Sequence, residues 1–236
     1  MGVRAAGFVA AVIISGAAAG AVFGIVTQAL AVPHIEAATL AEARAAGAAA
    51  GWDAYAEYRG WQGAGAAVAS IVLGCAFAAL YGAVYLAYGH RLPCRSATAR
   101  AYILAGAMWL ALYAVPAAKY PPSLPGEGSA ETLGARLGLH AALLAVSGAS
   151  ALALHRASLG ARGPRRALYP AAWVAIVAVA MAALPAHPGA EAAQGAWEFR
   201  AASAAAVAAY WAALPAVFVP LSRRLGGAAP PLRGRG

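Results

Sequence analysis

Charged residues are scarce in this 236-residue chain, in which Asp, Glu, Lys and Arg together make up 11%. A soluble domain carries about 25% charged residues, so the chain lacks more than half of the charge that normally solvates a protein surface. Hydrophobic residues make up 63%, which excludes a disordered chain because disorder needs low hydrophobicity. The composition therefore favours a membrane protein over a soluble enzyme, provided that the apolar residues fall in runs long enough to cross a bilayer.

Cysteines are few and the common catalytic motifs are missing. The two cysteines, Cys75 and Cys94, form no motif with each other and predict no disulfide framework. The sequence contains no P-loop, dinucleotide fingerprint, HExxH pair, nucleophile elbow or CxxC motif. We therefore expect a protein that is not an enzyme and that has no firmly implied cofactor.

Long runs without Asp, Glu, Lys or Arg are present instead. A hydrocarbon core of about 30 Å needs about 20 helical residues, so these runs predict an all-α, polytopic membrane helix bundle with six transmembrane helices. We expect a single bundle over residues 1–224, with an extracytoplasmic helical loop over 33–61 and a disordered cytoplasmic tail over 225–236. The first run is too long for a cleaved signal peptide, so we expect it to be retained. The runs cover residues 5–32, 62–89, 101–118, 137–154, 167–186 and 201–221.

The charges are divided unevenly between the two sides of such a bundle. The side with both termini carries 12 of the 17 Lys and Arg residues and no acidic residue. The other side carries the remaining five basic residues and all eight acids. Cytoplasmic loops are rich in Lys and Arg, so we expect both termini to be cytoplasmic. The net charge of +9 therefore reports orientation, with membrane lipid and not nucleic acid as the partner.

Small residues in the first run are spaced for close helix contact. Gly16, Gly20 and Gly24 recur every four residues and so share one face of a helix. Lipid gives little hydrophobic drive between helices, and small residues let their backbones approach closely. We expect this face to pack against another helix, either within the chain or between copies of the chain in a homo-oligomer.

Histidines and carboxylates gather on the predicted outer side. His34 and Glu36 follow the first run, His140 lies in the fourth, and His187 and Glu191 lie in the fifth loop. Imidazole with carboxylate suits first-row divalent metals such as Co²⁺, Ni²⁺ and Zn²⁺. These residues form a metal site if the bundle brings them together, and otherwise His34 and His187 are solvated interfacial residues. His140 is inside a span, where an ionisable residue indicates function by default.

Two blocks of sequence resemble a known family. The first begins at Pro116, continues through KYPPSLPG to Gly126, and leads to Arg136; the second is WEFRAAS, beginning at Trp197. Both are similar to blocks of the CbtA family, the predicted cobalt transporter subunits of bacteria. The resemblance implies a multi-pass protein of the bacterial inner membrane, tied to cobalt or cobalamin supply and often accompanied by a small single-span partner with a His-rich segment. Family members are usually described with about five spans, so five spans stay an alternative to the six counted here.

The proline-rich loop has a physical interpretation as well. Pro121, Pro122 and Pro125 fix φ and stiffen the chain, so the loop that ends at Gly126 can fold back toward the bundle as a rigid plug. A stiff loop of this kind is expected to have a structural or gating role at the outer face.

Two arginines stand at the outer ends of neighbouring spans, where each needs a carboxylate partner. Arg136 precedes the fourth run, and Arg200 precedes the sixth run beside Trp197. We interpret them as part of a clamp that closes the outer face, with substrate contact as the alternative. The acids available to them are Glu127, Glu131 and Glu198.

Together these observations predict an integral membrane transporter, or a subunit of one, for a divalent transition metal. The resemblance makes Co²⁺ the expected substrate, entering from the outer face past His34, His140 and His187. The alternative is a non-transporting scaffold or assembly subunit that binds other membrane proteins through its small-residue helix faces.

Overall fold

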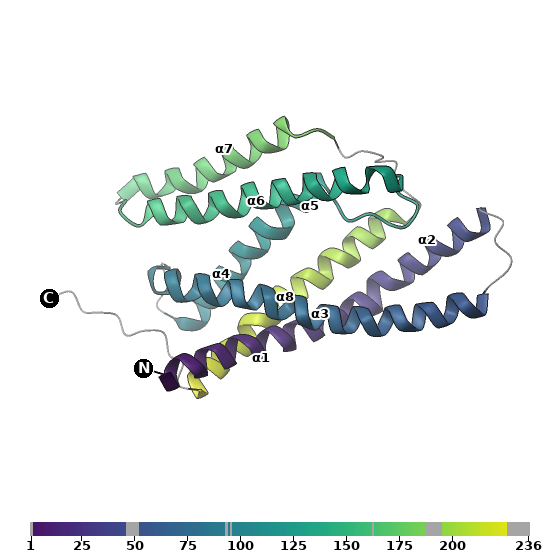
Figure 1. Cartoon of the computed structure of the whole chain (residues 1–236). Helices are drawn as coiled ribbons and strands as arrows, with labels where there is room; N and C mark the ends of the chain where they lie inside the picture. The colour runs from purple at the N-terminus through teal and green to yellow at the C-terminus, as the bar shows by residue number, and fades with distance from the viewer. Residues whose placement is uncertain are drawn as a thin grey trace. The chain divides into compact units, whose positions relative to one another are not determined.

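The computed structural model describes residues 2–45, 52–92, 94, 96–161, 163–186 and 195–225. These residues form helices joined by turns, with no strand among them, so the prediction of an all-α fold is confirmed (Figure 1). The α-helices are α1 (Gly2–Val26), α2 (Val32–Ala45), α3 (Trp52–Tyr88), α4 (Ala97–Trp109), α5 (Val115–Lys119), α6 (Leu133–Ser158), α7 (Leu168–Ala183) and α8 (Ala196–Arg224). Short π-helices cover Thr27–Ala31 (η1) and Leu110–Ala114 (η3), and 3-10 helices cover Gly89–Arg91 (η2), Ala130–Thr132 (η4) and Gly163–Ala167 (η5).

Within the described ranges, six helical segments are long and apolar enough to cross a membrane. They overlap the six apolar runs of the sequence, so the predicted number of spans is confirmed. Helix length and composition carry no information on direction, and the cytoplasmic placement of both termini stays a prediction. The segments are Ala5–Arg44, Gly60–Arg91, Ala97–Lys119, Leu133–Ser158, Arg165–Ala183 and Ala196–Arg224.

Helical backbone continues through Pro33, the residue at which the expected extracytoplasmic loop begins. The π-helix η1 precedes Pro33, and its wide turn is closed by a hydrogen bond from the Val32 N–H to the Thr27 carbonyl. Inside an α-helix a proline clashes with the carbonyl four residues earlier, and that carbonyl belongs here to the wide turn. The π-helix η3 stands in the same position before Pro116. Both prolines are thus accommodated inside helical segments and do not end them.

The chain divides into two compact units. Unit 1 consists of Met1–Gly106 and Ala201–Gly236, and unit 2 consists of Ala107–Arg200. The single bundle expected over residues 1–224 stays a prediction. The expected tail lies, after Leu225, outside the described residues.

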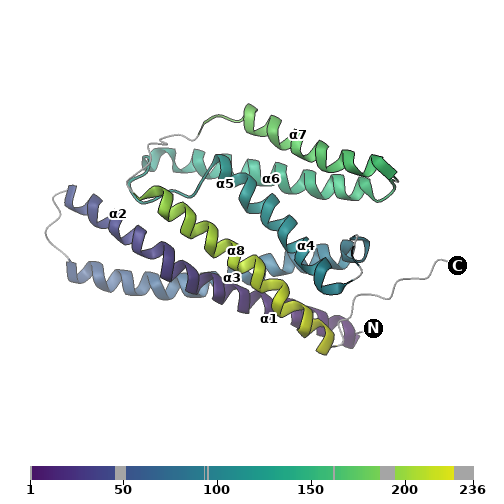
Figure 2. The same cartoon turned by 180° about the vertical axis from the view of Figure 1, so that it is seen from behind.

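In unit 1, α1 and α3 pack with their backbones in close contact (Figure 2). A Cβ added to Gly16 would lie 2.9 Å from the Gly74 carbonyl oxygen, and one added to Gly20 would lie 2.5 Å from the Ser70 carbonyl oxygen. A Cβ added to Gly24 would lie 3.3 Å from the Ser70 hydroxyl oxygen. Because α3 backbone atoms face Gly16 and Gly20, any larger residue there would force the two helices apart. The small-residue face of α1 is therefore used inside the chain.

α8 packs in unit 1 through aromatic rings. The Phe218 ring makes edge contacts with Tyr81 of α3 and Phe8 of α1, at centroid distances of 5.5 and 5.8 Å. The Tyr210 hydroxyl donates a 2.8 Å hydrogen bond to the Gly74 carbonyl. Tyr81 and Phe218 are almost fully buried, so these aromatic rings are part of the core of unit 1.

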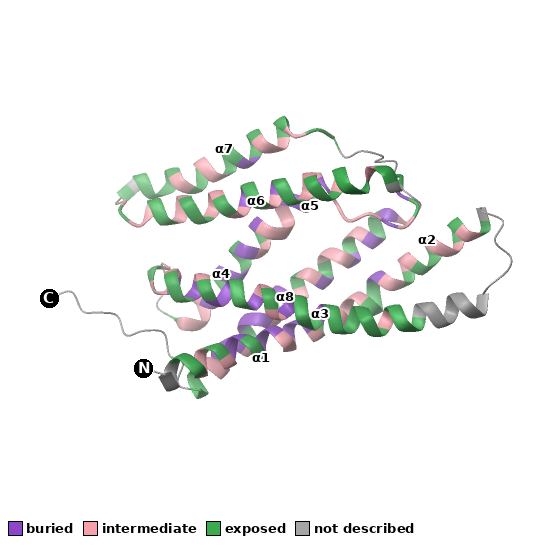
Figure 3. Ribbon diagram, viewed as in Figure 1, coloured by how far each residue is buried: buried purple, intermediate pink, exposed green. Residues whose placement is uncertain are grey.

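In unit 2, α6 and α7 lie side by side and are joined by a polar contact. The Trp173 indole N–H donates a 3.0 Å hydrogen bond to the Ser147 carbonyl. In their most apolar windows only 11% of α6 and 6% of the α7 segment is buried, against 33% for the segment that contains α1. Exposed and intermediate colours accordingly dominate both helices (Figure 3). The described residues thus leave most of the surface of both helices uncovered, and lipid can solvate such apolar faces as well as another helix does.

Candidate functional site

The proline-rich block forms a tight turn between α5 and α6. The Glu127 N–H donates a 3.1 Å hydrogen bond to the Leu124 carbonyl, which places Pro125 and Gly126 at the two central positions. Gly126 has a φ of +83°, as a type II turn requires after a proline. Only glycine adopts this conformation without steric cost, which explains the LPG sequence physically. Leu124 is buried and so anchors the turn.

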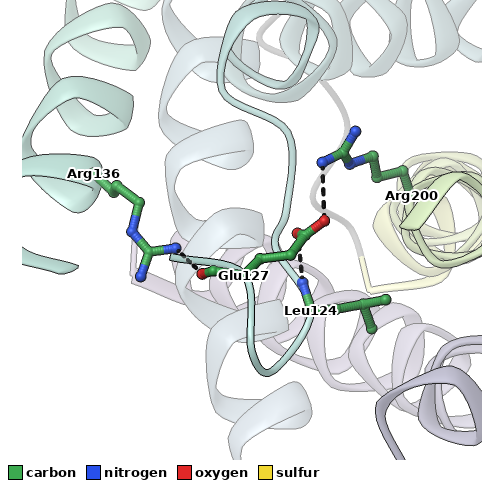
Figure 4. Close-up of polar contacts among 4 residues, drawn as sticks. All are labelled: Leu124, Glu127, Arg136 and Arg200. Carbon is green, nitrogen blue, oxygen red and sulfur yellow. Dashed lines mark hydrogen bonds and ion pairs between the residues drawn. The ribbon is translucent and has the colours of Figure 1, made fainter. Parts of the chain in front are cut away.

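The carboxylate of Glu127 is the centre of the candidate site (Figure 4). One carboxylate oxygen accepts a 2.9 Å hydrogen bond from the Leu124 N–H, and the other lies 3.3 Å from an Arg200 Nη atom in an ion pair. The Glu127 side chain is 4% exposed and that of Arg200 is 18% exposed. The Arg200 guanidinium also lies over the Trp197 ring, 5.4 Å from its centroid. A charge this buried needs a partner, and the pair holds the loop to the start of α8 within unit 2.

Arg136 approaches the same residue from the other side (Figure 4). Its Nη1 donates a 2.7 Å hydrogen bond to the Glu127 carbonyl, and its Nη2 lies 3.4 Å from the Ser129 carbonyl. Gly128 lies under the guanidinium with a φ of +76°, and a Cβ there would be 3.1 Å from the Arg136 Cζ. Arg136 thus binds the backbone of the loop, and Arg200 binds the carboxylate of Glu127. We call Glu127, Arg136 and Arg200 the loop clamp.

The other residues expected near the clamp have different surroundings. Glu131 and Glu198 have exposed side chains, and the Trp197 ring is exposed except for its contact with Arg200. Pro121 and Pro122 are half-buried in the extended stretch that leads to the turn. Of the three acids available to the arginines, the structure places Glu127 in the clamp.

Lys119 and Tyr120 precede the loop and bind the end of α7. Sequence reasoning did not select them as site residues. The Lys119 ammonium donates to the carbonyls of Met181 and Leu184, at 2.9 Å for Leu184, where a cation complements the C-terminal end of the helix dipole. The Tyr120 hydroxyl donates a 2.7 Å hydrogen bond to the Pro185 carbonyl. Burial raises the pKa of the Tyr120 phenol, so this hydroxyl stays protonated and keeps donating. The sequence does contain a signal for Lys119, because it is the only lysine of the chain and stands at the end of an apolar run.

His140 of α6 lies beside the same segment. Its Nδ1 is 3.2 Å from the Tyr120 carbonyl oxygen, so Nδ1–H donates there and Nε2 carries the lone pair. The imidazole is half-buried. Metal-ligating histidines usually donate their other ring N–H to a carboxylate, a backbone carbonyl or water, and the contact of His140 with Tyr120 is of this kind.

The remaining metal-site candidates are not gathered around His140 by any described contact. His34 is half-buried and Glu36 exposed on α2, in unit 1. His187 and Glu191 lie outside the described residues. Among the residues described, no group of three or more His, Cys, Asp and Glu side chains is placed to hold a metal ion. A shared metal site for these five residues stays a prediction.

A family model described as "Probable cobalt transporter subunit (CbtA)" matches residues 5–223. The chain belongs to the CbtA family. The match covers nearly the whole chain, including the loop clamp and the six candidate membrane segments up to residue 223. The resemblance found in the sequence is therefore confirmed. This CbtA protein is a multi-pass membrane protein. No curated protein and no solved structure that was compared with this chain matches it.

Proposed function

We propose that this CbtA protein is the membrane-embedded subunit of a cobalt transporter in the bacterial inner membrane and serves cobalamin supply. The family description, a probable cobalt transporter subunit, is the observation that carries the proposal. The six candidate spans suit a translocation unit, and the absence of catalytic motifs from the sequence favours transport over catalysis.

His140 is the ligand that we expect to meet the metal first in unit 2. Its Nδ1–H donates to the Tyr120 carbonyl, which leaves Nε2 as the coordinating atom. Co²⁺ accepts imidazole readily, and an ionisable side chain within a membrane segment is costly unless it serves a function. Tyr120 also binds Pro185, and His187 is two residues further along the chain. This arrangement supports His140 and His187 as members of one entry site.

The loop clamp gives this entry site a fixed wall. Glu127 is hydrogen-bonded within the turn and ion-paired with Arg200, while Arg136 binds the turn from the other side. Because Glu127 is already engaged in this way, we assign the clamp a structural and gating role in place of metal binding. Metal would then be delivered to the entry site by a small, single-span, His-rich membrane partner.

The entry site is tested by cobalt uptake in cells that carry His140→Asn or His187→Ala. Asn places an amide N–H close to the position of Nδ1, so His140→Asn keeps the hydrogen bond to Tyr120 while removing the ligand atom. We expect at least a tenfold loss of uptake in both variants at equal protein levels in the membrane. His155→Asn, in the last turn of α6, is the matched control and should transport normally. Normal uptake by both entry-site variants would overturn the assignment.

The scaffold alternative depends on small-residue faces that are free to bind other proteins. Gly16 and Gly20, the candidates for such a face, lie against α3 inside unit 1. We therefore favour transport, and a stable partner that co-purifies in the absence of any metal-dependent activity would reverse this preference.

A further inference from the structure

Three helix ends of unit 1 meet at a cluster of four arginines and one histidine. Arg91 and His90 lie in η2 just after α3, Arg100 lies in the first turns of α4, and Arg223 and Arg224 lie in the last turn of α8. We call these five residues the basic end. The sequence has no Asp or Glu between residues 58 and 126 or after residue 198, so no carboxylate of these segments neutralises the cluster.

Several contacts show that these side chains share one neighbourhood. Arg223 donates a 3.3 Å hydrogen bond to the hydroxyl of Thr98, which precedes Arg100 by two residues on α4. The positive charges of Arg100 and Arg223 both act on the buried side chain of Tyr85. The Tyr85 ring also lies against the backbone of Gly89, where a Cβ would be 3.1 Å from a ring carbon. η2 therefore adjoins the same aromatic residue as the two arginines.

Two buried donors at the basic end have no acceptor among the described residues. Arg91 donates a 3.1 Å hydrogen bond to His90 Nε2, so the neutral imidazole carries its proton on Nδ1. That Nδ1 atom and the Arg100 Nε atom are both buried and without a hydrogen-bond partner in the part of the chain that the structure describes. Buried donors are normally satisfied, so this pair indicates an acceptor supplied from outside the chain.

The backbone at the start of α4 also favours an anion at the basic end. α4 begins at Ala97 within this cluster and is 13 residues long, so the positive end of its dipole lies here, although the Ser96 hydroxyl already accepts a hydrogen bond from the Ala99 N–H. Cationic side chains, unpartnered N–H donors and a helix N-terminus together suit an oxyanion with several acceptor atoms, such as a phosphate.

The depth of the cluster indicates the source of that phosphate. It lies at the ends of three candidate membrane segments, Gly60–Arg91, Ala97–Lys119 and Ala196–Arg224. Lipid headgroups occupy the zone in which such segments leave the hydrocarbon core, and basic pockets between helix ends bind anionic headgroups. We propose that the basic end of unit 1 binds the phosphodiester of an anionic phospholipid, which thereby ties α3, α4 and α8 together.

The test uses the full-length protein purified in a neutral detergent. Phosphatidylglycerol, phosphatidylcholine or inorganic phosphate is added, and retained lipid is counted by native mass spectrometry beside the melting temperature. We expect phosphatidylglycerol to be retained and to raise the melting temperature, and phosphatidylcholine to do neither. Stabilisation by inorganic phosphate without any preference for phosphatidylglycerol would overturn the lipid assignment.

Variants locate the site on the chain. Arg100→Gln and Arg223→Gln should each lower phosphatidylglycerol retention at least fivefold, while Arg44→Gln, an exposed arginine of α2, should leave it unchanged. Arg91→Gln provides a second test if the other variants do not fold, because Arg91 is exposed and contributes little packing. Retention of phosphatidylglycerol by this variant should fall at least twofold. Equal retention in all four variants, or an equal loss in Arg44→Gln, would contradict the proposal.

Discussion

Unit 1 and unit 2 are held together in different ways. In unit 1, glycines of α1 face the backbone of α3, and aromatic rings of α8 fill the core. In unit 2, α6 and α7 bury little of their apolar surface, and the described contacts that fix loops and helix ends are polar. Dense packing dominates the described part of unit 1. Partly buried hydrogen bonds and the Glu127–Arg200 ion pair dominate that of unit 2.

This difference shows how membrane helices are stabilised without a hydrophobic effect between them. Lipid solvates an apolar helix face as well as another helix does, so a mostly exposed α7 has no energetic penalty in the bilayer. Association must come from close van der Waals contact or from polar groups that lipid cannot satisfy. Unit 1 mainly uses the first and unit 2 mainly the second.

The largest effect is expected for Gly20→Leu in α1. The new side chain would meet the Ser70 carbonyl and the Ile71 Cα, which cannot move without displacing α3. We expect a loss of more than about 4 kcal/mol in unfolding free energy, measured by SDS titration of the purified protein. Gly138→Leu in α6 is the matched control, because nothing lies within 4 Å of its added Cβ. It should be neutral or slightly stabilising, and equal losses in the two variants would remove the distinction between the units.

The next largest effect is expected for Glu127→Gln in the loop clamp. Removing one partner of a buried ion pair leaves the other charge without compensation, which costs about 3 kcal/mol at the lower end of the usual range because Arg200 is partly exposed. Glu131→Gln, at an exposed acid of the same loop, should change stability by less than about 0.5 kcal/mol. Thermal melts of both variants measure the difference.

A double variant separates the ion pair from other effects of the substitution. Glu127→Gln combined with Arg200→Gln should cost less than the sum of the two single losses, by about 1 kcal/mol or more. Strict additivity would show that the pair does not stabilise unit 2.

A smaller effect is expected at the two loop glycines with positive φ. Gly126→Ala introduces backbone strain alone, since its Cβ would meet nothing within 4 Å, and should cost about 1 kcal/mol. Gly128→Ala adds a contact with the Arg136 guanidinium and weakens its hold on the loop, so about 2–3 kcal/mol is expected. Melting temperatures in detergent should fall in that order, and the reverse order would remove Arg136 from the clamp.

The smallest effects are expected for one tyrosine hydroxyl in each unit. Tyr120→Phe removes a hydrogen bond to a carbonyl beyond the end of α7, at a cost of about 1 kcal/mol. Tyr210→Phe removes a bond to Gly74, whose carbonyl also belongs to the helical ladder of α3, at a cost of about 0.6 kcal/mol. A larger loss from Tyr210→Phe in chemical unfolding would show that unit 1 depends on polar contacts as much as unit 2.

Some of the candidate site followed from sequence reasoning because charge in an apolar setting needs a partner. Arg200 was expected to meet a carboxylate, and Glu127 was among the acids named for it. Gly126 was selected only through the family-like block, and its positive φ now supplies the reason. Arg136 was expected to meet a carboxylate as well, but its described hydrogen bonds join backbone carbonyls, whose positions depend on the folded path of the loop.

Other contacts had no sequence signal strong enough to predict them. Lys119 and Tyr120 bind carbonyls more than 60 residues away, and a carbonyl is present at every position of the chain. Which carbonyl is free depends on where α7 ends. A shared metal site depends on convergence of several segments of the chain. The site of His34, His140 and His187 therefore remains a hypothesis, and the uptake experiment tests His140 and His187.

The sequence by itself predicted the six helical segments of the described residues that are long and apolar enough to cross a membrane, because run length and charge scarcity are local properties. It also identified the family through two short blocks. Only the tertiary structure decided which helix faces Gly16 and Gly20, which acid meets Arg200, and which N–H donors at the basic end have no acceptor among the described residues. These outcomes depend on three-dimensional neighbours far apart along the chain, and lipid, which solvates every apolar face about equally, does not select among them.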